Sequence, residues 1–222
     1  MMDYKRIPCH IGIIPDGNRR WAQAHGYGKQ AGYDYGVEPG VRAYQACREL
    51  GVEELTFYGF TVDNTKRPAE QKAAFQKACV AAVNALCAYD ADILVVGNTK
   101  SPAFPEELLP LAEKPVTFGQ GGIRVNFLIN YSWSWDLNYP LRQQESAEKN
   151  SNDLLKQIAS HDISRMDLII RWGGRRRLSG FLPVQSIYAD FFVIEDYWPD
   201  YQPEHLEQAL AWYQKQDVTL GG

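Results

Sequence analysis

Residues 10–22 read HIGIIPDGNRRWA. Within them, the apolar run Ile11–Ile14 predicts a buried strand of a parallel sheet. The strand stops at the turn cluster PDGN, in which either Asp16 or Asn18 can cap a following helix. Free N–H groups at the start of a helix favour an anion, and a carboxylate can bind Mg²⁺. This corner is therefore a candidate site for a metal ion and a phosphate, although an ordinary strand–turn–helix corner has the same pattern.

Apolar runs typical of strands alternate with helical patterns outward from this stretch. A helical face is indicated over Gly40–Leu50 and a longer helix over Ala69–Ala88. The stretch Arg142–Asn152 is polar and indicates a loop before a helix at Asp153–Ser160. The alternation predicts an α/β fold, namely a single domain over residues 1–222 with a mainly parallel six-stranded sheet flanked by helices. The six strand runs are Ile11–Ile14, Leu55–Phe60, Ile93–Val96, Val125–Ile129, Leu168–Ile170 and Phe191–Ile194.

The composition is that of a globular protein. The 222 residues (25.2 kDa) include 45% hydrophobic and 23% charged residues, and a chain of this length can bury a core without disulfides or structural metals. A net charge of -4 and a pI near 5.6 argue against general nucleic-acid binding. The four cysteines have neither CxxC nor zinc spacing, and no signal peptide or membrane-spanning run is evident. We therefore expect reduced thiols and a cytoplasmic protein.

Polar side chains follow several of the predicted strands. Asp16 follows the first strand, Thr61 and Asn64 follow the second, and Arg171 follows the fifth. Ligands of open parallel sheets bind outside the carboxyl ends of the strands. Arg171 also opens the run RWGGRRR, and arginines on a glycine turn suit a pyrophosphate. We expect these side chains to converge on one site.

Four segments resemble signatures of one enzyme family. Residues 10–22 closely resemble the first signature of the cis-prenyltransferases, the undecaprenyl diphosphate synthase family, in which a strand ends in Asp-Gly-Asn before Arg-Trp-Ala. LTFYGFTVDNTKRP (55–68) resembles the second signature, a strand followed by a Ser-x-x-Asn-Trp-x-Arg-Pro loop. DLIIRWGGRRRLSGF (167–181) and IYADFF (187–192) resemble two late segments of the family. The resemblance covers nearly the whole chain and implies the cis-prenyltransferase fold, isoprenyl diphosphate substrates, Mg²⁺ and a homodimer.

The resemblance also implies roles for individual residues. Asp16 and Asp190 would together hold Mg²⁺, with Asp190 in place of the family's glutamate. Asp16, Asn64 and Thr61 are the candidate catalytic residues, and Asn64 with Thr61 would steer proton loss. The residues that would bind substrate are Gly17, Asn18, Arg19, Arg20, Trp21, Lys29, Tyr33, Arg67, Arg171, Arg177 and Ser179.

The chain departs from the family pattern where substrate would be held. Lys29 and Tyr33 stand where the family usually has an arginine and a histidine. Lysine holds phosphate as a point charge, and tyrosine keeps a hydroxyl donor but does not titrate near neutral pH. Thr65 replaces a tryptophan, and Arg175 replaces a glutamate. Together these changes resemble the irregular short-chain branch represented by cyclolavandulyl diphosphate synthase, in which two dimethylallyl diphosphates join head-to-middle before cyclisation.

The resulting hypothesis is an Mg²⁺-dependent enzyme that couples C5–C10 isoprenyl diphosphates. It joins dimethylallyl diphosphate head-to-middle, with or without cyclisation, and isopentenyl and geranyl diphosphate are further candidate substrates. Cations and the metal would draw away one diphosphate while the second substrate is held in position. The side chains expected to favour ionisation of the first diphosphate are Arg20, Lys29 and Arg67. Those expected to fix the second are Arg171, Arg177 and Ser179.

Other interpretations stay open. The same fold could run regular head-to-tail elongation with isopentenyl diphosphate, giving C15 or longer chains. The chain could also be a non-catalytic partner subunit of an active homologue, although the retained carboxylates and arginines argue against that. Locally, Thr61–Asn64 could be only a capping turn, and the apolar side chains of Ala69–Ala88 could be core packing. Trp133 and Trp135 could fill a pocket or anchor a loop. Tyr27, Tyr33 and Tyr35 could serve only to pack their loop against the protein, without a direct role in substrate binding.

Overall fold

The computed structural model describes residues 4–112, 114–139 and 156–217. The predicted polar loop at Arg142–Asn152 lies outside these residues, as do residues 153–155 of the helix expected at Asp153–Ser160. The remaining residues of that segment, 156–160, form turns and not a helix.

One seven-stranded sheet organises the chain, in the order β4-β3-β5-β2-β1-β6-β7. All neighbouring strands pair in parallel except β3 and β4, which are antiparallel. The predicted mainly parallel sheet is thus confirmed, with one strand more than expected. The three-residue edge strand β4 was missed because it is too short for a period to appear and is only partly buried. The strands are β1 His10–Ile14, β2 Glu54–Tyr58, β3 Ala91–Val96, β4 Val116–Phe118, β5 Ile123–Leu128, β6 Leu168–Arg171 and β7 Asp190–Val193.

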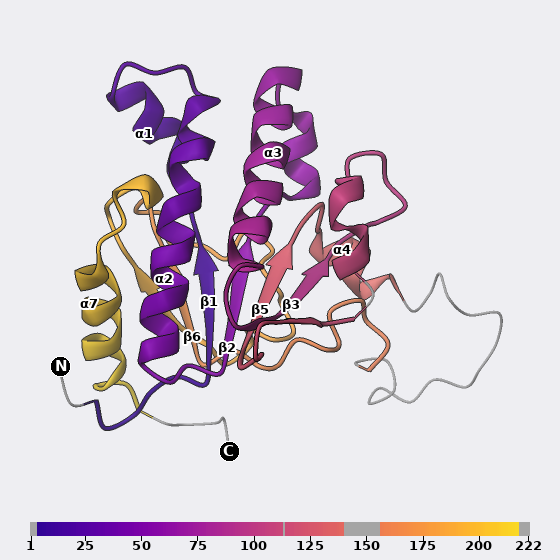
Figure 1. The fold of residues 1–222 in the computed structure, drawn as a ribbon. Coiled ribbons are helices and arrows are strands. Elements are labelled where there is room, and N and C mark those ends of the chain that lie inside the picture. The colour runs from indigo at the N-terminus through magenta and orange to yellow at the C-terminus, as the bar shows by residue number, and fades with distance from the viewer. Residues whose placement is uncertain (1–3, 113, 140–155, 218–222) are drawn as a thin grey trace.

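Helices cover one face of this sheet. Figure 1 shows α2, α3 and α7 standing side by side in front of the strands, with α1 beyond their upper ends. The predicted helices over Gly40–Leu50 and Ala69–Ala88 are confirmed as α2 and α3. The α-helices are α1 Asn18–Ala24, α2 Val37–Glu49, α3 Ala69–Leu86, α4 Trp133–Leu137 and α7 Pro203–Tyr213, and short 3₁₀ helices are η1 Ala31–Gly36, η2 Val62–Lys66, η3 Glu106–Leu111 and η4 Trp198–Asp200. No helix among the described residues is long and apolar enough to cross a membrane.

The two faces of the sheet have separate cores because successive side chains of a strand point to opposite sides. On the helical face, Ile11 and Ile13 of β1 belong to the larger cluster, together with buried side chains of α2, α3 and α7. On the other face, Ile14 packs with Met166 and Phe181, which come from turns and loops. Gly12 faces this second core, where an added Cβ would lie 2.6 Å from the Phe181 ring. The strand at the centre of the molecule is therefore closely packed on both sides.

The turn after β1 differs from its prediction in one detail. Neither Asp16 nor Asn18 caps α1 through its side chain, and the N-cap is Gly17 at φ 106°. The Asp16 carboxylate instead accepts from the Gly17 amide at 2.6 Å, and the Asn18 amide donates to the Pro15 carbonyl at 2.9 Å. A left-handed backbone conformation at this position favours glycine. Because Gly17 is the N-cap, the Asp16 carboxylate is available to contact other segments.

Candidate active site

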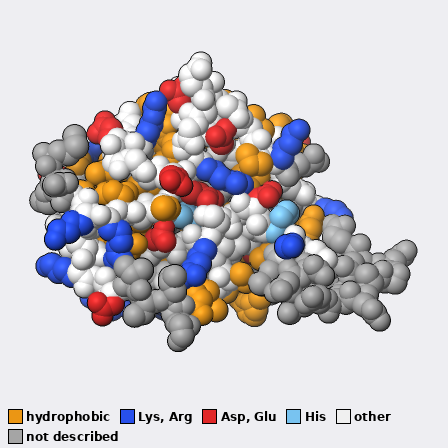
Figure 2. Space-filling view, turned by 90° about the horizontal axis from the view of Figure 1, so that it is seen from below, with side chains coloured by type: hydrophobic (Ala, Val, Ile, Leu, Met, Phe, Trp, Pro, Cys, Tyr) orange, Lys and Arg blue, Asp and Glu red, His pale blue; other side chains and the backbone are white. Residues whose placement is uncertain are grey.

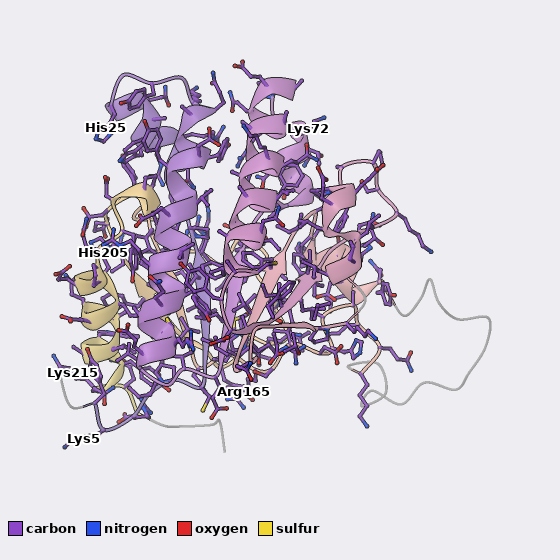
Figure 3. The ribbon with its side chains drawn as sticks, viewed as in Figure 1. Lys5, His25, Lys72, Arg165, His205 and Lys215 are labelled. Atoms are coloured by element: carbon purple, nitrogen blue, oxygen red, sulfur yellow. The ribbon has the colours of Figure 1, made fainter. Side chains whose placement is uncertain are left out.

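A polar pocket opens at the carboxyl ends of the central strands. It has an empty volume of about 1430 Å³, part of it open to solvent. Figure 3 marks this end of the molecule by His25 near α1 and Lys72 at the start of α3. Two carboxylates, Asp16 and Asp63, face it. Seven cationic side chains line the same pocket: Arg19, Arg20, Lys29, Arg67, Arg171, Arg175 and Arg177.

Asp16 lies where β1, β6 and α1 meet. Its Oδ2 accepts from Nη2 of Arg171 at 2.7 Å, and its Oδ1 lies 3.4 Å from Nη2 of Arg20, one helical turn later. The pairing of Ile14 with Arg171 across the β1–β6 ladder sets the first contact. Burial by itself would raise the pKa of Asp16, but the hydrogen bond and charge of Arg171, with help from Arg20, hold it below its ordinary value. Asp16 is therefore an anion at neutral pH inside a strongly cationic pocket.

Arg171 organises the loop that follows β6. Its side chain is only 5% exposed. Its Nη1 donates to the Arg177 carbonyl and, at 3.0 Å, to the Ser179 hydroxyl, while Tyr58 at the end of β2 donates its hydroxyl to the Ser179 carbonyl at 2.7 Å. The Nε of Arg171 is buried without a hydrogen-bond partner among the described residues. A buried donor left in this state calls for an explanation, and a bound ion or a catalytic role is one.

The glycines of this loop are required by close packing. Gly173 has φ +80°, and an added Cβ would lie 2.5 Å from Nη2 of Arg20. Gly174 has φ +70°. The left-handed backbone of both residues turns the chain directly after β6 and lets Arg20 approach it. The Gly-Gly pair thus brings Arg20, Asp16 and Arg171 into one cluster.

Arg67 and Tyr33 meet on the helical side of the pocket. The Arg67 guanidinium donates from Nη1 to the Tyr33 hydroxyl at 2.6 Å. Tyr33 is buried, at 4% exposed. Burial raises the pKa of Tyr33 and lowers that of Arg67, and each partner opposes the other's shift. Since Tyr33 accepts this bond, its own hydroxyl proton is left to donate elsewhere.

Thr61 and Asn64 form the capping turn that their spacing predicted. Asn64 Oδ1 accepts from the Thr61 amide at 2.8 Å, and the Thr61 hydroxyl accepts from the Asn64 amide, so the two residues cap the start of η2. Both residues also line the polar pocket. The local capping interpretation is therefore confirmed, and it also brings both side chains to the site.

Trp21 was predicted to bind substrate, but the structure places its side chain outside the polar pocket. Its indole donates to an oxygen of Asp200 at 2.6 Å and stacks on His25 with ring centroids 4.3 Å apart. It is buried, and it is absent from the described lining of the polar pocket. On a helix, Trp21 and Arg20 point in different directions, so the arginine faces the pocket while the tryptophan anchors α1 to η4.

Asp190, predicted to hold the metal ion together with Asp16, does not lie beside Asp16 within one chain. It is the first residue of β7 and pairs with Leu168, which pairs in turn with Ile11. The carboxyl end of β7, on the side of the pocket, comes three residues after Asp190. Asp190 therefore lies roughly 10 Å along the strand from that end. Arg165, which stacks on Tyr188 at 4.4 Å, is labelled at the lower end of the molecule in Figure 3. The sequence match identified the residue type but not the end of the strand on which it lies.

Of the two carboxylates that face the pocket, Asp16 is the better candidate to hold Mg²⁺, because Asp63 is largely exposed and pairs with Lys66. Among the described residues there is no group of three His, Cys, Asp or Glu that could bind a metal on its own. Protein sites commonly hold Mg²⁺ by one or two carboxylates together with phosphates of the substrate. The ionised and partly exposed Asp16, surrounded by phosphate-binding cations, fits that type of site. The two-carboxylate site predicted from sequence is not formed by this chain alone.

Eight of the described residues that line the pocket were not among the predicted site residues, and the three with the largest side chains are Tyr58, Phe75 and Arg175. Tyr58 supports the Ser179 carbonyl, Arg175 adds a cation on the Gly-Gly turn, and Phe75 contributes a ring from α3. Only Arg175 had a sequence signal, because it extends the arginine run. Tyr58 and Phe75 were indistinguishable from core residues, since an aromatic residue at a strand end or on a helix face usually packs inside. All the predicted site residues other than Trp21 and Asp190 line the pocket: Asp16, Gly17, Asn18, Arg19, Arg20, Lys29, Tyr33, Thr61, Asn64, Arg67, Arg171, Arg177 and Ser179.

The two tryptophans after β5 lie outside the polar pocket. Trp133 is 53% exposed and lies against the Gly180 turn, and Trp135 packs edge-on against Tyr131 at 6.3 Å. Neither is part of the described lining of that pocket. The loop-anchoring alternative is the one that the structure supports.

Comparisons with known proteins point to a single family. The Prenyltransf family model, undecaprenyl diphosphate synthase, matches residues 14–221. An isoprenyl transferase of Nitrosomonas europaea is 31% identical over 97% of this chain and 86% of its own length. The ditrans,polycis-undecaprenyl-diphosphate synthase ((2E,6E)-farnesyl-diphosphate specific) of Escherichia coli K12 is 30% identical over 96% of this chain and 89% of its own. The crystal structure of lavandulyl diphosphate synthase from Lavandula x intermedia, in complex with dimethylallyl diphosphate, superposes with a TM-score of 0.80 at 21% identity, covering 97% and 98% of the two chains. At that identity it shows a shared fold.

Proposed function

Since the chain belongs to the undecaprenyl diphosphate synthase family of prenyltransferases, we propose that it is an Mg²⁺-dependent prenyl diphosphate synthase for short substrates. It couples C5–C10 isoprenyl diphosphates by head-to-middle condensation of dimethylallyl diphosphate, with or without cyclisation. The observation that carries the proposal is the pocket in which Asp16 is surrounded by seven arginines and lysines. Such an excess of cations suits two diphosphate groups held together. The proposal includes a homodimer, the assembly implied by the sequence resemblance.

The first diphosphate is assigned to the cations between α1 and η2. Arg20, Lys29 and Arg67 line this part of the pocket. Their charges stabilise the negative charge that grows on a departing pyrophosphate, which lowers the barrier to breaking the allylic C–O bond. Asp16 would hold Mg²⁺ beside the first diphosphate, and the bound ion would add charge stabilisation to the leaving group.

The second diphosphate is assigned to the loop after β6. Arg171 and Ser179 are already joined by a hydrogen bond of 3.0 Å, so this part of the site is formed before substrate arrives. Arg177 completes it from the same turn. A preformed anchor fixes the nucleophilic alkene of the second substrate against the carbocation of the first, which removes most of the entropic cost of the encounter.

Loss of a proton ends the coupling step. We assign it to the turn formed by Thr61 and Asn64, whose polar side chains line the pocket opposite the arginine loop. Their mutual capping bonds fix both groups, so they steer the proton lost from the cation toward the released pyrophosphate, which accepts it.

The short-chain, irregular form of the reaction is supported by the residues that depart from the family pattern. Tyr33 is held by Arg67 where the family pattern has a histidine, and Thr65 provides no flat aromatic contact. Arg175 adds positive charge where the pattern has a carboxylate. These changes favour a pocket for two small allylic diphosphates.

The deciding experiment supplies paired C5 substrates. The protein is incubated with Mg²⁺ and dimethylallyl diphosphate, alone and together with isopentenyl diphosphate, and the dephosphorylated products are separated by chromatography. A branched or cyclic C10 alcohol from dimethylallyl diphosphate alone is the expected result. If no combination yields a coupled diphosphate, the proposal is wrong.

Regular head-to-tail elongation is the second candidate function. It is favoured by the curated relatives, since the Escherichia coli protein is named as an undecaprenyl diphosphate synthase. In the same experiment it would give linear products of C15 or longer, and only when isopentenyl diphosphate is present. A third candidate, the non-catalytic partner subunit, would give no product alone and a stable complex with an active homologue.

A further inference from the structure

The loop between β7 and η4 packs against the corner between β1 and α1. Its backbone is fixed at two points, because the Asp196 carbonyl accepts from the Gly173 amide at 2.7 Å and the Trp198 amide donates to the Asp16 carbonyl at 3.0 Å. Tyr197 lies between these two bonds in the chain. The position of its side chain is therefore set by the same backbone that surrounds the pocket.

His205 of α7 ties this loop to the one that follows β6. Its Nε2 lies 3.2 Å from a carboxylate oxygen of Asp196, and its Nδ1 accepts from the Trp172 indole at 3.2 Å. The His205 side chain is buried, and Figure 3 shows it at the upper end of α7, below His25 at the end of α1. The loop that carries Tyr197 is therefore held against the Gly-Gly turn through side chains as well as through the backbone.

The ring of Tyr197 contacts the β1–α1 corner at two places. An added Cβ at Gly17 would lie 2.6 Å from Cδ1 of the ring, so the ring packs directly on the backbone after Asp16. The guanidinium carbon of Arg20 lies over the same ring, 5.0 Å from its centroid. A cation over the face of an aromatic ring is attracted by the quadrupole of the ring. Tyr197 is not part of the described lining of the polar pocket, so it acts on the pocket through these neighbours.

Arg20 depends on such contacts for its direction. Its side chain is 35% exposed, and among the described residues its one ion pair is the long contact of Nη2 with Oδ1 of Asp16, at 3.4 Å. On another side it meets Gly173, where an added Cβ would lie 2.5 Å from the same Nη2. An arginine side chain samples many rotamers, and holding it in one of them has an entropic cost. The Tyr197 ring and the Gly-Gly turn meet this cost within the folded protein, before an anion binds.

We propose that Tyr197 is a positioning residue, whose ring holds the Arg20 guanidinium in the direction needed to bind the departing pyrophosphate. The inference rests on the proposed function, because Arg20 is assigned there to the first diphosphate. The ring restricts the rotamers of Arg20, so the positive charge is already in place when the allylic C–O bond breaks. The face of the ring makes this contact, and the Tyr197 hydroxyl is not required for it.

The test is a double-mutant cycle between Tyr197→Leu and Arg20→Ala. Leucine fills space against Gly17 but has no aromatic face for Arg20, whereas Tyr197→Phe keeps the ring and removes the hydroxyl. Tyr188→Leu is the matched control, because it removes a tyrosine that stacks on Arg165 at 4.4 Å, at the lower end of the molecule in Figure 3. Each protein is assayed for kcat and KM with dimethylallyl diphosphate and Mg²⁺. Binding of inorganic pyrophosphate with Mg²⁺ is measured by calorimetry on the same samples.

We expect Tyr197→Leu to lower kcat about tenfold and to weaken pyrophosphate binding about fivefold, changes of the size that one lost cation–π contact gives. KM should change much less than kcat, as when an interaction of the transition state is removed. Tyr197→Phe should restore both values, and Tyr188→Leu should leave both unchanged. In the Arg20→Ala background, Tyr197→Leu should cause no further loss, because the ring then has no cation to position.

No loss in Tyr197→Leu, or equal losses in the two backgrounds, would overturn the proposal. Equal losses would show that the ring supports the backbone at Gly17 and not the direction of Arg20. Should Tyr197→Leu not fold, Tyr197→Met goes through the same cycle with the same expectation.

The pyrophosphate measurement separates this inference from the proposed function. If wild type couples no pair of substrates, but Tyr197→Leu weakens pyrophosphate binding only where Arg20 is present, the proposed reaction fails and the positioning role stands. If wild type couples C5 substrates, and the loss in Tyr197→Leu is absent or independent of Arg20, the reaction stands and the positioning role fails.

Discussion

The two ends of the sheet both carry buried polar clusters, but only one of them is internally paired. At the amino ends of the strands, His10 contacts the Thr56 hydroxyl at 2.8 Å and the Ser164 carbonyl at 3.0 Å, while Asn126 donates to Glu54 at 2.6 Å. Figure 2 looks onto this end and shows acidic and basic side chains next to one another. Each of these groups has a hydrogen-bond partner within the chain, as buried polar groups usually have.

At the carboxyl ends, the charges do not balance. Asp16 and Asp63 are the carboxylates among the described residues that line the polar pocket, against seven cations. Among the described residues, no carboxylate forms a salt bridge with Lys29, Arg175 or Arg177 that would offset its charge. Such an imbalance raises the energy of the unliganded protein and is recovered when an anion binds. We therefore assign the cluster at the amino ends, the lower cluster, to folding, and the cluster at the carboxyl ends, the upper cluster, to binding.

The largest effect is expected from Asp16→Asn. The change removes the one carboxylate that joins Arg171, Arg20 and the candidate metal position. We expect kcat/KM to fall about a thousandfold, the size of a lost metal contribution of roughly 4 kcal/mol. Steady-state kinetics at saturating Mg²⁺ check this result.

Asp63→Asn is the matched control for that prediction. Asp63 lines the same pocket, but its side chain is 83% exposed and it pairs only with the exposed Lys66 at 2.7 Å. An exposed pair of this kind contributes little, so kcat/KM should stay within about threefold of wild type. Equal losses in the two variants would show that the pocket needs negative charge in general and not Asp16 in particular.

A second, smaller loss of activity is expected from Arg171→Lys. Lysine keeps the charge but cannot bond Asp16, the Arg177 carbonyl and Ser179 at the same time, so the loop after β6 loses its organiser. KM for the second substrate should rise about a hundredfold, equivalent to roughly 2.7 kcal/mol. Arg176→Lys is the control in the same loop, since Arg176 is exposed and pairs with Glu195, and its kinetics should be unchanged.

Much of this arrangement could be predicted from sequence, for a physical reason. The strands of the sheet are apolar runs because both faces are buried, and the site residues follow them because parallel strands end at a common edge. The strand β4 was missed because its three residues are too few to show an alternating pattern. Trp21 was grouped with the pocket because it follows Arg20 directly in α1, although its indole bonds Asp200 instead.

What could not be predicted depends on contacts between distant segments. Asp190 matched a family position, yet its side of the molecule follows from the register of β7 against β6, which no local pattern contains. The stack of Tyr33 on Phe75 joins η1 to α3 and was equally hidden. Residue types are local information, whereas which end of a strand a residue occupies is a property of the assembled sheet.

The lower cluster should determine stability without affecting catalysis. Asn126→Ala leaves Glu54 and the Thr56 hydroxyl without their shared donor in a buried place. The free energy of unfolding should fall by about 1–3 kcal/mol, the usual cost of orphaned buried polar groups, while kcat is unchanged. Urea unfolding and kinetics on the same sample check both parts. The exposed Asn84→Ala is the control, with a change within about 0.5 kcal/mol. A loss of kcat in Asn126→Ala would contradict the division between the two ends.

The smallest effect is a pH dependence of opposite sign at the two ends. The folded-state pKa of Asp16 is lowered, so its carboxylate stabilises the protein above the ordinary value near 3.9, and this contribution is lost as pH falls through the folded value. Burial raises the folded-state pKa of Asp190, so its ionisation destabilises the protein as pH rises through that range. Relative to wild type, the unfolding temperature of Asp16→Asn should therefore fall between about pH 3 and pH 7, whereas that of Asp190→Asn should rise. Thermal unfolding of the three proteins across this range measures both slopes, and slopes of the same sign would mean that the carboxylates at the two ends sit in equivalent environments.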